Sequence, residues 1–85
     1  MSILLNINLG GGSMVEISLA SIRRIMKKAG IERVSKDAVE ALRDLAEEYI
    51  FRLSQLASEL ADHAGRKTIL KQDVLMAARI LAQKP

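Results

Sequence analysis

The stretch His63-Ala64-Gly65-Arg66-Lys67-Thr68-Ile69 joins two segments of opposite charge at a glycine that marks a helix end. Residues 37–62 before it hold two Lys/Arg and seven Asp/Glu, whereas residues 63–85 hold five Lys/Arg and one acid. Residues 19–36 are also basic, with six Lys/Arg and one acid. The net charge of +3 therefore conceals two basic regions on either side of an acidic middle. This pattern favours contact with a polyanion through the flanking regions.

The composition indicates one small helical domain. The chain has 85 residues, of which 49% are hydrophobic, yet it contains one Tyr, one Phe and no Trp. Such a short chain buries little of its surface alone, so we expect a partner to complete its core. It has no cysteine for disulfides or thiolate metal sites, and no apolar run near the ~18–20 residues of a membrane span. We expect a soluble intracellular protein.

Apolar spacing predicts an all-α, short–long–short arrangement, with helices over about 18–29, 36–64 and 70–85. Gly30 and Gly65 are placed to end the first two helices in the left-handed conformation, and Ser35 is placed to cap the second. The apolar positions of the long helix cover more than one short neighbour could bury. We therefore expect a second copy of the long helix to pack against it.

Residues 1–13 are uncharged and end in Gly-Gly-Gly-Ser, before a second methionine, Met14. We interpret them as an appended or disordered leader with a Gly/Ser linker, and residues 14–85 as the folded domain. The alternative is a strand-forming arm that pairs with another chain, since apolar residues alternate over residues 3–9.

Little in the chain favours catalysis. His63 is the only histidine, no Gly-rich phosphate loop follows a strand, and the acids of the long helix have the spacing of solvated faces. We expect no enzyme activity, no cofactor, no metal and no small-molecule substrate.

Binding to double-stranded DNA agrees better with the basic residues, since phosphate contacts need only Lys, Arg, Ser/Thr and helix N-termini. The scarcity of aromatic residues argues against stacking on single strands. No helix carries an Asn/Arg pattern for reading bases. For any single basic residue, a solvated surface position is an equally good interpretation.

Residues 19–82 resemble an archaeal histone. The first helix resembles that family's over Ala20-Ser21-Ile22-Arg23-Arg24-Ile25-Met26-Lys27-Lys28-Ala29-Gly30, and the first loop over Glu32-Arg33-Val34-Ser35. The second loop resembles it over residues 63–69, followed by Asp73-Val74. The two loop motifs at this separation are highly specific. The resemblance implies a histone fold that forms an intertwined dimer.

The resemblance implies that six residues contact DNA: Arg24, Lys27, Arg33, Arg66, Lys67 and Thr68. Arg24 would enter the minor groove, and the second loop would lie beside the first loop of the other protomer. The family also pairs the arginine matching Arg66 with the aspartate matching Asp73, so Arg66 could serve mainly to hold the loop. Thr68 has the same alternative role.

Leu60, His63 and Asp73 match positions through which histone dimers meet and stack. A histidine at a helix C-terminus is otherwise a favourable cap. Asp62 and Glu59 add acids near this contact, where relatives often have a basic residue, and should weaken or retune stacking. Serines at 18 and 21 replace prolines usual in the family, so we expect a looser start to the first helix.

The function that the resemblance implies is the binding, bending and wrapping of double-stranded DNA without sequence preference. The protein would act as a homodimer that can stack into tetramers or filaments, in the cytoplasm on the nucleoid or chromosome, without membrane contact. The alternative is a histone-fold subunit that heterodimerises in a transcription or chromosome-maintenance complex and binds DNA weakly or not at all.

Overall fold

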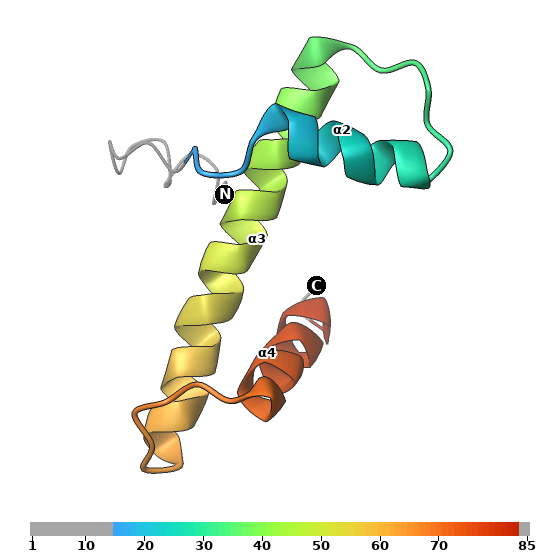
Figure 1. The fold of residues 1–85 in the computed structure, drawn as a ribbon. Helices are drawn as coiled ribbons and strands as arrows, with labels where there is room; N and C mark the ends of the chain where they lie inside the picture. Colours follow the sequence, from blue (N-terminus) through green and yellow to red (C-terminus); the bar gives the residue numbers. More distant parts are fainter. Residues whose placement is uncertain (1–14, 84–85) are drawn as a thin grey trace. The chain divides into compact units, whose positions relative to one another are not determined.

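The computed structural model describes residues 15–83, which form three helices in chain order, α2, α3 and α4 (Figure 1). Their bounds are Leu19–Lys28 for α2, Lys36–His63 for α3 and Lys71–Gln83 for α4. The described residues contain no strand, so the predicted short–long–short, all-α arrangement is confirmed. The predicted leader, residues 1–13, lies outside the described part of the chain.

The chain divides into two compact units between Glu48 and Tyr49, within α3. The N-terminal unit (residues 15–48) contains α2 and the first part of α3. The C-terminal unit (residues 49–83) contains the rest of α3 and α4. The 28 residues of α3 run on through the division without interruption, which gives a helix about 42 Å long at 1.5 Å per residue.

Serine caps begin the first two helices. Ser18 is the N-cap of α2, and its Oγ accepts a hydrogen bond from the N–H of Ser21 at 3.0 Å. Ser35 caps α3 in the same way, since its Oγ accepts from the N–H of Ala38 at 3.1 Å, as predicted. Each hydroxyl satisfies one of the backbone donors that a helix leaves free at its start.

Glycines end the first two helices with one shared geometry. Gly30 and Gly65 have φ of 86° and 76°, in the left-handed region that residues with a Cβ rarely adopt. The N–H of Ile31 reaches back to the carbonyl of Met26 at 3.0 Å, and that of Arg66 to Ala61 at 2.9 Å. These backward bonds define the Schellman motif. They turn the chain sharply into two short loops, residues 29–35 and 64–70, named here the first and second loops.

The buried apolar core is small and made mostly of small side chains. Ile22 and Val39 are buried in the N-terminal unit, and Ala57, Ala61 and Ala77 in the C-terminal unit. By contrast, many large apolar side chains are open to solvent in the single chain. On α3 these are Leu42, Leu45, Tyr49, Ile50 and Phe51, and on α4 they are Val74, Leu75 and Met76.

This exposure is extensive for a chain of this size. Leu45, Ile50 and Leu75 are each more than half exposed, at 52%, 53% and 53%. Single exposed apolar residues are ordinary, but a series of them within each unit marks a surface that another protein covers. The single chain thus retains the unburied apolar positions that the sequence predicted for the long helix.

Candidate nucleic-acid interface

The basic residues predicted in the N-terminal unit lie on its surface. Arg24 and Lys27 belong to α2, where Arg24 is exposed and Lys27 is open to solvent, and Arg33 is exposed in the first loop. The Nη2 of Arg24 donates to the Oγ of Ser21 at 3.2 Å, a weak neutral partner. Among residues 15–83, none of these three cations forms an ion pair. Their charge is therefore available to an external anion.

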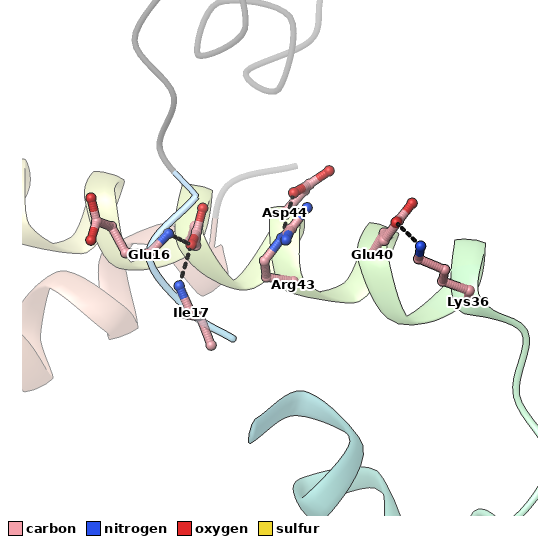
Figure 2. A network of polar contacts seen from close by, with 7 residues as sticks. Glu16, Ile17, Lys36, Glu40, Arg43 and Asp44 are labelled. Carbon is pink, nitrogen blue, oxygen red and sulfur yellow. Dashed lines mark hydrogen bonds and ion pairs between the residues drawn. The ribbon is translucent and has the colours of Figure 1, made fainter. Parts of the chain in front are cut away.

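Cations on α3 are arranged differently. The Nζ of Lys36 lies 4.0 Å from Glu40, and the Nε of Arg43 donates to Asp44 at 3.1 Å (Figure 2). Arg43 is also largely covered, with 15% of its side chain exposed. The acidic helix thus offsets these charges internally. The cations without acid partners are concentrated on α2 and in the loops.

The second loop separates two roles that its sequence combines. Lys67 is exposed and forms no hydrogen bond or ion pair within the described residues, whereas Arg66 points its guanidinium into the loop. The Nη1 of Arg66 donates to Asp73 Oδ2 at 2.7 Å and to the carbonyl of Thr68 at 3.1 Å. Its Nη2 donates to Asp73 Oδ1 at 3.0 Å. Arg66 therefore holds the loop closed, while Thr68 is exposed and contributes its carbonyl.

Asp73 is the centre of this loop structure. It is 4% exposed, and besides both bonds from Arg66 it accepts the N–H of Leu70 at 2.8 Å. Because Leu70 immediately precedes α4, this bond is the backward half of a capping box at the helix start. The hydrogen bond from Arg66 lowers the pKa of Asp73 to about 2, the Leu70 N–H adds to this, and burial opposes it. The same pairing raises the pKa of Arg66.

The residues expected at a dimer–dimer contact divide by exposure. His63 is the last residue of α3 and is exposed, and Leu60, one turn earlier, is half-buried. Asp62 and Glu59 are exposed beside them. Asp73 is instead committed to the second loop, with both carboxylate oxygens bonded to Arg66. His63 and Leu60 are therefore the members of this set whose side chains a neighbouring molecule could reach directly.

Two acids of α3 occupy positions that the sequence did not predict. Glu47 and Glu48 are 8% and 7% exposed, so they do not lie on a solvated face. The Oε2 of Glu47 accepts the backbone N–H of Glu16 and, at 2.7 Å, that of Ile17 (Figure 2). Ser18 and Ser21 also bond to each other at 2.8 Å through their hydroxyls. The start of α2, expected to be looser without proline, is thus fixed by a serine cap and by Glu47.

Sequence patterns give one weak signal for Glu47. It follows the buried Val39 by about two helical turns and so lies near the same side of α3. Period alone cannot distinguish this from a solvated position, because its partners are backbone groups some 30 residues earlier in the chain.

Other kinds of site find no support in the described residues. Within residues 15–83, no three His, Cys, Asp or Glu side chains are grouped so that they could hold a metal ion. The same residues include no helix with the length and apolar character needed to traverse a bilayer.

Three helices with cations in the two loops and on the first helix define a class of small proteins with a basic surface. A family model described as histone-like transcription factor (CBF/NF-Y) and archaeal histone matches residues 15–78. The chain belongs to this family, and its helices form the histone fold.

Three relatives show the range of the family. The chain is 47% identical over 66 residues to the archaeal histone HAN1 of Thermococcus zilligii, covering 78% of this chain and 98% of the relative. It is 39% identical to probable archaeal histone 3 of Methanocaldococcus jannaschii, with the same coverage. It is 37% identical over 67 residues to the transcriptional activator hap3 of Schizosaccharomyces pombe, covering 76% of this chain and 58% of the activator.

Proposed function

We propose that the protein is a histone that binds, bends and wraps double-stranded DNA as a homodimer, without sequence preference. The observation that carries this proposal is the separation of charges. Arg24, Lys27, Arg33 and Lys67 have no acid partners among the described residues, whereas Lys36 and Arg43 on α3 are paired with acids. The matches to two archaeal histones along 98% of their length support it.

The exposed apolar surface supports the dimer. A second chain would cover Leu45 and Ile50 of α3 and Leu75 of α4, which a folded single chain leaves in water. The loops carry apolar residues of their own, Ile31 at 44% exposed and Ile69 at 41%. Pairing the first loop of one protomer with the second loop of its partner would cover both. It would also bring a first-loop cation close to a second-loop one.

DNA binding would then be mainly electrostatic. Pairs of loops and the two α2 helices would present cations at intervals along one curved surface, where phosphates of a bent duplex displace counterions. Arg24 would enter the minor groove, and Lys27, Arg33 and Lys67 would contact phosphates. Arg66 and Thr68 would act chiefly through loop geometry, because Arg66 is neutralised by Asp73. The ease of bending each sequence would supply any residual preference.

Assembly and location follow from this proposal. Dimers would meet through His63 and Leu60 and stack into tetramers or longer arrays, with Asp73 acting indirectly by fixing the second loop. The exposed acids Glu59 and Asp62 would limit that stacking. We place the protein on the chromosome in the cytoplasm, with no membrane, cofactor or small-molecule substrate, and we propose no enzyme activity.

A second candidate function is a heterodimerising component of a transcription or chromosome-maintenance complex. The match to the activator hap3, at 37% identity, favours it. The two proposals differ in behaviour when the protein is alone. A homodimeric histone folds and binds DNA unaided, whereas an obligate heterodimer component stays unfolded or aggregates.

A titration on unrelated duplexes at several salt concentrations tests the DNA proposal. We expect similar affinity for every sequence and a steep fall in affinity as salt rises, because each phosphate contact releases counterions. Affinity that is independent of salt, or restricted to one sequence, would refute it. Sedimentation of the same preparation without DNA distinguishes the homodimer from a chain that needs another partner.

A further inference from the structure

The buried carboxylate of Glu47 is joined to the chain immediately before α2. It lies on α3, is 8% exposed, and accepts the backbone N–H groups of Glu16 and Ile17 through Oε2 (Figure 2). Among the described residues it forms no ion pair with Lys, Arg or His. Its negative charge is therefore stabilised by backbone donors, which makes it a connection between α3 and the start of α2.

We propose that Glu47 is a positioning residue for DNA binding, which holds α2 in the orientation that its cations need on the duplex. This proposal rests on the DNA-binding function proposed above. Because Glu47 is buried within the N-terminal unit, it acts on DNA only through α2.

The shortness of α2 makes such a connection necessary. The helix has 10 residues, fewer than an isolated helix needs for stability in water, and Ile22 is its only buried residue. One buried side chain leaves the helix free to rock about that point. Fixing the two residues before its N-cap provides a second attachment. A carboxylate suits this place, since it bonds strongly to N–H donors and lies near the positive end of the helix.

A continuous set of hydrogen bonds links this attachment to a predicted DNA contact. Ile17, held by Glu47, precedes Ser18, whose Oγ accepts the Ser21 N–H at 3.0 Å and lies 2.8 Å from the Ser21 Oγ. That hydroxyl in turn accepts from the Nη2 of Arg24 at 3.2 Å. A shift at Glu47 should therefore alter the position of Arg24, the residue proposed to enter the minor groove.

The test compares Glu47→Ala and Glu47→Gln with the wild type, and with Glu40→Ala as a matched control. Glu40 is also an acid of α3 in the N-terminal unit, but it is paired with Lys36 at the surface. Amide hydrogen exchange measures protection of the Glu16 and Ile17 N–H groups without DNA. Duplex affinity and fluorescence-measured bending are then compared at a temperature where circular dichroism shows all variants fully helical.

Loss of the carboxylate should expose the two amides to faster exchange and weaken duplex binding by about threefold or more. Glu47→Gln should recover part of that loss, because its amide oxygen still accepts a hydrogen bond. In double-mutant cycles, Glu47→Ala should couple with Arg24→Ala on α2 and add independently to Lys67→Ala in the second loop. A merely structural role would not produce this difference.

Two results would overturn the proposal. One is a folded Glu47→Ala protein that binds and bends DNA like the wild type, and the other is equal coupling to Arg24 and Lys67. If Glu47→Ala does not fold, the same cycle is run with Glu47→Gln and read by the same criteria. Failure of the wild type to bind DNA would refute the proposed function itself, whereas protected Glu16 and Ile17 amides would still report the attachment.

Discussion

At the scale of single residues, neighbouring cations of the second loop have different tasks. Arg66 is bonded to Asp73 and to the Thr68 carbonyl, whereas Lys67 is exposed and has no partner among the described residues. An arginine with both terminal nitrogens on a carboxylate fixes geometry well but offers an external phosphate little net charge. Adjacent basic residues should therefore respond differently to substitution.

Replacing Lys67 or Arg24 with alanine should weaken binding about equally on all duplexes. Each change should also flatten the dependence of log affinity on log salt by roughly one unit, because one phosphate contact is lost. Fluorescence anisotropy over a salt series measures both effects. Lys71→Ala, at the start of α4, is the control and should retain the wild-type slope. Wild-type slopes for both variants would show that neither cation contacts phosphate.

Asp73 should make the fold sensitive to acid. Its pKa is lowered to about 2 in the folded chain from an ordinary value of 3.8, so folding favours the ionised form. The resulting stabilisation is fully present above the unfolded pKa, near 4, and is lost as pH falls toward 2. Urea denaturation of the wild type between pH 5 and pH 2 should show this loss. Asp73→Asn should be less stable at pH 5 and approach the wild type at pH 2; parallel curves at all pH values would contradict it.

At the scale of helices, α3 acts as a shared element with polar and apolar parts of its surface committed to different neighbours. Val39 and Glu47 lie within the N-terminal unit, and Ala57 and Ala61 within the C-terminal unit. Leu45 and Ile50 remain about half exposed. A helix whose apolar positions exceed what its own chain covers is stable only when a further surface packs against it.

Ile50→Asp should therefore prevent folding, although Ile50 is 53% exposed in the single chain. In the dimer the new carboxylate would be buried without a partner, which costs several kcal/mol or more. Circular dichroism and sedimentation should show loss of helix and of dimer together. Gln55→Asp, at an exposed polar position on the same helix, should fold normally. A helical monomer of Ile50→Asp would show that the chain needs no second copy.

At the scale of the whole molecule, stacking on DNA depends on surfaces that dimer formation leaves free. His63 is exposed at the end of α3, close to the acids Glu59 and Asp62. An added negative charge here should oppose contact between dimers while leaving each dimer and its DNA cations intact.

His63→Glu should therefore shorten the DNA that assembled protein protects. Nuclease digestion of wild-type complexes should yield a ladder of protected lengths, and the variant should yield mainly the shortest one. Sedimentation of the free variant should still show a dimer. A single protected length for the wild type would mean that dimers do not stack, and an unchanged ladder in the variant would exclude His63 from the contact.

The sequence alone determined the helices and their ends, because those depend on groups a few residues apart. Ser35 caps α3 through Ala38, and the positive φ of Gly30 and Gly65 follows from the steric freedom of glycine. The motif around residues 63–69, with Glu32-Arg33-Val34-Ser35, likewise led to the histone family, which the family match confirms. Charge counted by segment also located the basic regions.

Only the tertiary structure decided which charged side chains are free and which are committed. Glu47 has the spacing of a solvated acid, but the folded chain places it against the backbone of Glu16 and Ile17. Arg66 and Lys67 are indistinguishable by charge, yet one is bound to Asp73 and the other is not. The physical reason is that a side chain's partners are set by distances between segments brought together on folding, which neither composition nor helical period encodes.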